Sequence, residues 1–432
     1  MKKHLIAAAV AAAVAAPAMA QNVEIYGVLD QGWTDIETDT DRDRSNSTVN
    51  PQITEFRNDH SKLNTTGNGG AFTSQRLGFR GTEDLGGGMK ANFTLEFGLG
   101  DSDGDRANSF AISNDTANPT TVRQAWVGLS GSMGSIRAGR MVNFVDGAWA
   151  AGSVGSQNNF LGSAYNQRET NARSDRLIEY VTPAFSGFTA GVQYGTRDET
   201  SKRESGTTTP TTNAEVKFSD EVSEMGLTLR YANGPLNVNW GYQQLEGKRE
   251  SIGRTTTVGA VFSAAQITEL GLDEDDEIAV DNLDNKLERN NWVLGASYNL
   301  GPVTLFGLYN DLEFSNKNRL DNEKTSHNGT MYEIGARVPI GAFTLSASFF
   351  DGNIKRKQPG ELENSEAKTK TGFDGYQLIA LYSLSKRTTM YGVYGSVSTD
   401  RKFSDPRTVD NTRTDKFNVE VENYGFGIRH TF

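Results

Sequence analysis

The chain has 432 residues, carries 54 acidic against 43 basic side chains and contains no cysteine. Because a phosphate-binding surface needs a basic footprint, the net charge of −11 disfavours nucleic acid as the main partner. Aromatic residues make up 9% of the chain, which argues against wholesale disorder, and the longest apolar run, 5–16, is shorter than the ~20 residues of a membrane-spanning helix.

The start of the chain has the organisation of a secretory signal peptide. Lys2 and Lys3 form a positive start, the apolar run follows, and Ala18-Met19-Ala20 fits a cleavage site of small residues. The alternative, a surface amphipathic helix, would need a polar face, which this run lacks. We therefore expect residues 1–20 to be removed on export and residues 21–432 to form one domain. Its stability must come from something other than disulfides, since it has no cysteine.

From residue 23 onward, segments of about ten residues alternate apolar and polar side chains. In 236–244, for example, Val238, Trp240 and Tyr242 lie on one face, and asparagine or glycine lies on the other. The same pattern returns in 188–194, 225–231, 291–299 and 330–338. A period of two predicts strands with one apolar and one polar face.

The connections between these strands alternate in length. Short turns are predicted at 83–89, 131–134, 183–187, 233–235, 300–302, 339–342 and 385–387. Long polar loops are predicted at 34–72, 98–120, 141–172, 196–222, 246–289, 313–329, 352–372 and 398–418. Seven turns and eight loops imply sixteen strands. An even number of strands, with short connections at one end and long ones at the other, is typical of an outer-membrane barrel.

A soluble β-sandwich is the competing interpretation. Sandwich strands usually run about 5–6 residues and bury their apolar face between two sheets. The strands predicted here reach about 9–11 residues, which is enough to cross a bilayer when tilted. Their second face is rich in Asn, Gln, Thr, Glu and Arg, as a water-filled lumen requires, and closure removes open sheet edges. The sequence therefore predicts an all-β, 16-stranded antiparallel transmembrane β-barrel with short periplasmic turns and long extracellular loops.

The last strand carries a further mark. Tyr424, Phe426 and Ile428 alternate with small or polar residues, and the chain ends at Phe432. A terminal aromatic residue on an alternating strand resembles the signal that the barrel assembly machinery reads. We expect Phe432 to act as this assembly signal.

Six segments resemble the trimeric general diffusion porins of Gram-negative bacteria. They are 23–30 (VEIYGVLD), 75–86 (QRLGFRGTEDLG), 123–129 (RQAWVGL), 134–140 (GSIRAGR), 384–388 (LSKRT) and 427–432 (GIRHTF). The resemblance implies a homotrimer in the outer membrane, in contact with its lipid and lipopolysaccharide, with a third loop folded into the lumen. It implies a water-filled channel for passive diffusion of ions and small hydrophilic solutes, without a cofactor. A substrate-specific channel and a barrel-anchored adhesin or enzyme remain the alternatives.

The composition of the third loop, 141–172, independently favours inward folding. Its only charged residues are Asp146, Arg168 and Glu169, whereas 22% of the whole chain is charged. It also contains Phe144, Trp149 and other apolar residues that a loop in water has little reason to carry. We expect it to pack against the inner wall; packing over a neighbouring loop is the alternative.

Arginines are the candidate pore-lining residues, because a guanidinium stays charged at any relevant pH. Arg76 and Arg80 share one strand face, opposite apolar neighbours, so both should point inward. By resemblance, Arg76, Arg123 and Arg173 match the wall arginines that face the third loop. Alternatively, an inward arginine is solvated or pairs with a lumen carboxylate such as Glu96 or Glu179.

The loop side of the pore departs from the best-known members of the family. They carry an acidic Pro-Glu-Phe-Gly-Gly type segment, whereas Asp146 is the only acid in the first part of this loop. Arginines that face few acids favour anions at the constriction, whereas acidic outer loops concentrate cations at the mouth of the pore. The sequence therefore leaves the ion preference open, with a slight lean toward anions.

No catalytic or metal-binding motif stands out. The chain has no HExxH, no G-x-S-x-G and no Walker A sequence, so we expect neither an enzyme nor a resident metal. The acidic segments 101–105 and 273–277 could bind divalent cations that bridge lipopolysaccharide, but solvated, self-repelling loops are the simpler interpretation.

Overall fold

The computed structural model describes residues 22–45, 54–64, 72–99, 122–155, 164, 172–204, 215–252, 255–257, 277–279, 284–318, 324–359, 366–408 and 411–432. The predicted signal peptide, 1–20, lies outside these residues, as do the acidic segment 101–105 and most of the segment 273–277.

The described residues are mainly strands, with one short helix. The strands are β1 (Asn22–Ser45), β2 (Thr54–Asn64), β3 (Arg76–Gly86), β4 (Met89–Gly98), β5 (Val122–Gly131), β6 (Gly134–Val142), β7 (Arg173–Val181), β8 (Phe188–Glu204), β9 (Glu215–Asn233), β10 (Leu236–Ile252), β11 (Thr255–Thr257), β12 (Glu277–Ala279), β13 (Asp284–Asn299), β14 (Thr304–Asn318), β15 (Lys324–Ile340), β16 (Phe343–Pro359), β17 (Glu366–Ser383), β18 (Thr388–Thr408) and β19 (Asn411–Thr431). The helix is α2 (Phe144–Gly152), which follows β6. Over the described ranges, no helix combines the length and hydrophobicity needed to cross a membrane.

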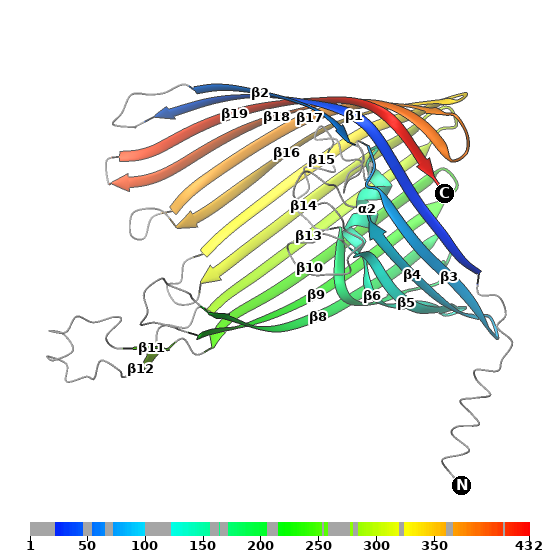
Figure 1. Ribbon diagram of the computed structural model, residues 1–432, viewed down its shortest axis with the longest axis horizontal. Coiled ribbons are helices and arrows are strands. Elements are labelled where there is room, and N and C mark those ends of the chain that lie inside the picture. The colour runs from blue at the N-terminus through cyan, green and yellow to red at the C-terminus, as the bar shows by residue number, and fades with distance from the viewer. Residues whose placement is uncertain are drawn as a thin grey trace, which may run out of the picture.

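The sheet closes on itself. β1 pairs with the last strand, β19, along one edge and with β3 along the other, and all its neighbours are antiparallel. β2 and β3 pair with different halves of β1 and share one position in the ring, so the 17-stranded sheet has sixteen positions. Figure 1 shows the tilted strands side by side around the wall, with α2 inside. The predicted closed barrel of sixteen antiparallel strands is confirmed.

Alternation along each strand separates an outer from an inner face. On β17, Tyr376 and Leu378 are 42% and 50% exposed, whereas Gln377 between them is 1% exposed. The exposed set of large apolar residues recurs around the ring, as a lipid-facing band requires, and the polar set points inward. The alternation of apolar and polar residues in the sequence therefore corresponds to alternation between the outer and the inner face of the barrel.

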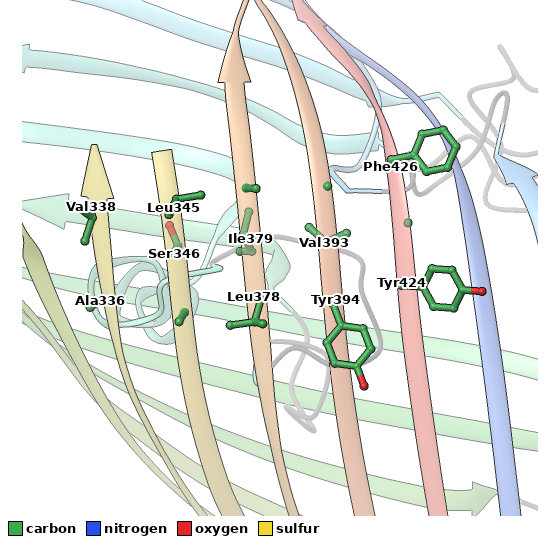
Figure 2. A pocket seen from close by; sticks show the side chains of 14 residues that line it. Ala336, Val338, Leu345, Ser346, Leu378, Ile379, Val393, Tyr394, Tyr424 and Phe426 are labelled. Carbon is green, nitrogen blue, oxygen red and sulfur yellow. The ribbon is translucent and has the colours of Figure 1, made fainter. Parts of the chain in front are cut away.

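The outer face is not smooth everywhere. Figure 2 shows Leu345, Leu378, Tyr394 and Phe426 around a shallow hollow that crosses β15 to β19. The hollow forms at small outward residues such as Ala336, because a larger side chain at these positions would fill the space.

The short connections occur where they were predicted. Gly234 and Gly341, in the turns after β9 and β15, have φ angles of 56° and 61°. This left-handed region is strained for residues with a Cβ, so glycine suits these tight hairpins.

Six of the eight predicted long loops are wrong in extent, because their flanking residues continue the strands. β18 and β19, for instance, pair as far as Thr408 and Asn411, where 398–418 was predicted as loop. Beyond the apolar band both faces of a hairpin are polar, so the backbone ladder continues without an alternation that sequence patterns can detect. Only the connections predicted at 98–120 and 141–172 have the expected strand boundaries.

Candidate functional site

The helix α2 lies against the inner wall. Asn143 caps its N-terminus: the side-chain Oδ1 accepts a hydrogen bond from the backbone N–H of Asp146 at 2.9 Å. Val145, Ala148 and Trp149 are at most 1% exposed. They form one apolar cluster with inward residues of the strands from β13 to β18, among them Val293, Leu308, Met331, Phe350, Phe373 and Val397. The predicted packing of this part of the third loop against the inner wall is observed.

Glycines in the wall allow the helix backbone to approach. A Cβ added to Gly295 would lie 2.8 Å from the backbone nitrogen of Gly152, and one added to Gly241 would lie 2.7 Å from the carbonyl carbon of Phe144. Such contacts are shorter than real Cβ atoms make, so a larger residue at either position would push α2 away from the wall.

The chain that leaves α2 is held by two charged residues of β15. Arg337 Nη2 donates to the carbonyl oxygen of Val154 at 2.8 Å. Glu333, which is 1% exposed, hydrogen-bonds to Ser153 and to the backbone of Val154. The loop segment is therefore fixed by apolar packing along the helix and by polar contacts at its end.

Asp146 is buried in the first turn of α2. Its side chain is 3% exposed, so the carboxylate is shielded from the open lumen. Its position suits a helix N-terminus, where a negative charge is favourable.

Arg76 and Arg123 come together on the opposite part of the wall. Arg123 Nε donates to Glu96 Oε1 at 2.8 Å, and the two side chains are only 12% and 5% exposed. The hydroxyl of Tyr26 donates to the second oxygen of Glu96 at 3.0 Å. Arg76 interacts electrostatically with Arg123, Glu96 and Arg429. Two guanidiniums, those of Arg76 and Arg123, thus interact with buried Glu96, and the guanidinium of Arg429 interacts with Arg76.

A β-bulge turns Arg123 inward. Glu96 of β4 pairs with Gln124, and the next residue, Phe97, pairs with Val122, so Arg123 is an extra residue in β5. Without the bulge, Arg123 would share the outward face of Val127, which is 62% exposed. Bulges re-aim side chains in this way.

Arg80 lies further along β3, toward the short turn that leads to β4. Its Nε and Nη2 donate to the two oxygens of Glu24 at 2.9 and 2.8 Å, and the pair is exposed. The guanidinium also lies over the ring of Tyr26, 5.0 Å from its centroid. Arg80 is therefore separate from the group around Glu96, although it shares the inward face of Arg76.

Arg173 lies in a different pocket, at the start of β7. This pocket, of about 230 Å³, is also lined by Glu224 and Arg289. Glu224 accepts hydrogen bonds from Ser174 Oγ and Gln243 Nε2, both at 2.6 Å. Arg173 is thus not part of the Arg76–Arg123 group. Within the described ranges, no group of three or more His, Cys, Asp or Glu side chains could hold a metal.

Sequence reasoning missed several inward arginines. Arg137 pairs with buried Glu179 and lies over the ring of Trp126, 4.7 Å from its centroid. Its neighbour Ile136 is 47% exposed and faces outward, so simple alternation within 134–140 would have identified Arg137. Arg230, Arg289, Arg337 and Arg429 were also not predicted. The alternative that wall arginines pair with Glu96 or Glu179 is observed for Arg123 and Arg137.

Phe432 lies at the seam where the ring closes. Its backbone oxygen accepts from Gly27 N at 3.1 Å, and its backbone nitrogen donates to Gly27 O at 3.2 Å. The phenyl ring lies over Gly27, at a place where a Cβ would collide with it.

Three comparisons relate this chain to known proteins. The family model described as Gram-negative porin matches residues 7–402. An outer membrane porin protein of Bordetella pertussis is 29% identical over the full length of both chains. Outer membrane porin protein 32 of Delftia acidovorans is 30% identical over 91% of this chain and 88% of its own. A solved structure described as an anion-selective porin from Comamonas acidovorans covers 95% of this chain and 100% of its own, with a TM-score of 0.50 and 23% identity.

Proposed function

This chain belongs to the Gram-negative porin family, and from that premise we propose that its diffusion path is narrowed between α2 and the arginines around Glu96. It is an outer-membrane porin that forms a channel for diffusion. In this proposal the path toward the periplasm is lined first by Arg76 and Arg123 and then by Arg80. Arg173 lines the pocket next to α2. Buried Asp146 acts by stabilising the helix.

The placement of α2 is the observation that carries this proposal. The helix contacts β9, β10, β13 and β14, whereas Arg76 and Arg123 belong to β3 and β5, on the far side of the ring. A solute that passes along the lumen therefore moves between a packed helix and a charged wall. Fixed guanidiniums create a field across that passage, which sorts ions by charge.

We further propose a slight preference for anions. Three guanidiniums, from Arg76, Arg123 and Arg429, interact with two carboxylates, Glu96 and Asp30. The excess of positive charge supports the preference. The solved porin that is named anion-selective has 23% identity, so its likeness supports the fold and the arginines support the selectivity.

Planar-bilayer recording tests the proposal. We expect ohmic steps whose conductance does not saturate with salt. In a KCl gradient, the reversal potential should be displaced from zero toward the equilibrium potential of chloride. Block by one class of solute would favour a substrate-specific channel instead. Absence of conductance from folded protein would overturn the channel and favour an anchored adhesin or enzyme.

The assembly is proposed on the same premise. We propose a homotrimer of passive channels without enzymatic activity, exported by the signal peptide 1–20 and recognised by the assembly machinery through Phe432. Lipopolysaccharide would surround its outer half. A band that migrates as a trimer and is lost only on boiling would support this assembly, and amino-terminal sequencing should begin at Gln21. A monomer band before boiling would overturn the trimer.

A further inference from the structure

A second segment, residues 72–75 just before β3, also lies on the inner side of the wall. On the side of β1 that faces β3, the ladder with β3 ends at Val28, and the ladder with β2 begins only at Gly32. Between these points Asp30 is fully buried and faces the interior. Residues 72–75, which immediately precede β3, lie against the wall here.

Asp30 binds the returning backbone. Its Oδ2 accepts hydrogen bonds from the backbone N–H groups of Thr73, at 2.6 Å, and Phe72, at 3.3 Å. Its Oδ1 accepts from the hydroxyl of Tyr391 at 2.6 Å. Bonds to an ionised carboxylate are among the stronger hydrogen bonds in proteins. One side chain of β1 therefore joins the segment 72–75 to β18.

The ring of Phe72 covers an apolar patch of the inner wall. Its centroid lies 5.2 Å from that of Tyr391, and the two rings cluster with Ile379 and Val393. These residues of β17 and β18 alternate with outward ones such as Leu378, so they face the lumen. Inward apolar residues are unexpected in a wet lumen, and Phe72 shields them from water.

The segment also contacts the arginine group. Arg429 Cζ lies 5.6 Å from the centroid of Phe72, and Arg429 Nη1 is 3.5 Å from Thr73 Oγ1. Arg429 in turn interacts electrostatically with Arg76, the first residue after the segment. The position of two guanidiniums is therefore linked to how firmly residues 72–75 are held.

We propose that residues 72–75 form a second inward-folded element of the pore, which Asp30 and Tyr391 hold against the wall. In this role Asp30 and Tyr391 are positioning residues: they fix Phe72, and Phe72 and Thr73 fix Arg429 beside Arg76. The lumen is thus narrowed by two elements, α2 over β9–β14 and Phe72 over β17 and β18. This inference rests on the proposed conduction path.

Substitutions at Phe72 and Tyr391 test it in the full-length protein. Phe72→Ala removes the ring without changing charge, and we expect a higher single-channel conductance and a weaker anion preference. Tyr391→Phe removes only the hydroxyl that donates to Asp30, and we expect more open-channel noise and a smaller shift of the reversal potential in the same direction. Tyr394→Phe is the matched control, since its hydroxyl lies on the outer face of the same strand and donates to Glu422 at 3.0 Å.

Asp30→Asn separates positioning from charge. Removing a negative charge from the wall would by itself strengthen anion preference, whereas release of the arginines would weaken it. We expect the weaker preference, with higher conductance. The folded state of each variant is checked by heat-modifiable migration. Unchanged conductance and reversal potential in folded Phe72→Ala, or a stronger anion preference in Asp30→Asn, would overturn this inference. Absence of conductance in the unaltered protein would instead overturn the proposed function.

Discussion

Two parts of the inner wall differ in what they present to the lumen. The wall from β13 to β18 carries apolar inward residues, such as Val293 and Phe350, and both are fully buried under the third-loop cluster. The wall from β3 to β7 carries arginines and carboxylates, which occur as pairs such as Arg123–Glu96 and Arg137–Glu179. The first wall has an apolar patch that a loop covers, and the second is dominated by charged pairs.

The difference shows how one barrel serves two purposes. Covering an apolar patch removes it from water and so stabilises the fold, which explains why the loop docks on this wall. A charged side chain is tolerated only when water or an opposite charge compensates it, so the charged wall stays paired and next to the lumen. On the proposed diffusion path, the covered surface therefore fixes the width and the charged surface fixes the field.

Truncation of Trp149 should disturb the covered wall most. Trp149 is fully buried between α2 and the strands, and Trp→Ala substitutions in packed cores typically lose about 3–5 kcal/mol. Since the loss falls on the docking of α2, we expect Trp149→Ala to raise single-channel conductance and current noise with little change in the heat stability of the barrel.

The outward Trp240 provides the control for this substitution, because it stacks with Tyr242 on the lipid-facing side of β10. Trp240→Ala should leave conductance unchanged. If Trp149→Ala conducts like the unaltered channel, α2 does not set the width of the path.

Breaking the Arg123–Glu96 pair should disturb the charged wall. Removal of one partner from a buried pair typically costs about 3–5 kcal/mol, because the other charge stays buried without compensation. Arg123→Gln should shift the reversal potential toward cations, and Glu96→Gln should shift it toward anions, each with a smaller change of conductance than Trp149→Ala.

Lys357→Gln is a suitable control for this pair, since Lys357 forms an exposed ion pair with Glu366, 3.3 Å apart, at the far ends of β16 and β17. It should have little effect on the reversal potential. Shifts of the same sign in Arg123→Gln and Glu96→Gln would contradict a field set by this group.

The same two walls show what the sequence could predict. Alternation identified the outward face of several strands, such as those that contain 236–244 and 330–338, because lipid selects apolar residues at every second position. It also indicated Arg76 and Arg80 as inward residues. The inward aim of Arg123 depends on a bulge, which places an extra residue in β5 and reverses the alternation. Only the family resemblance pointed to Arg123, since a bulge leaves no signal in the alternation of a single strand.

Contacts between distant segments were harder to predict. Asp30 is separated by about forty residues from Phe72 and by 361 residues from Tyr391, so nothing local links them. The docking of the third loop was predicted only in part. The apolar composition of 141–172 indicated a packed loop, but it did not indicate the strands against which the loop packs. The extended hairpins gave none, since both of their faces are polar.

The exposed pair Arg80–Glu24 should give the smallest effect and sharpens the contrast between buried and exposed charges. Both side chains are more than half exposed, at 55% and 57%, and exposed pairs are screened by salt. The Debye length is about 3 Å at 1 M salt but about 30 Å at 0.01 M. Arg80→Gln should therefore leave the reversal potential unchanged in concentrated KCl and shift it slightly toward cations in dilute KCl, whereas Arg123→Gln should shift it in both. A shift of equal size at both salt concentrations would show that Arg80 faces a passage too narrow for mobile ions to screen it, and would move the narrowest point toward the periplasmic end of β3.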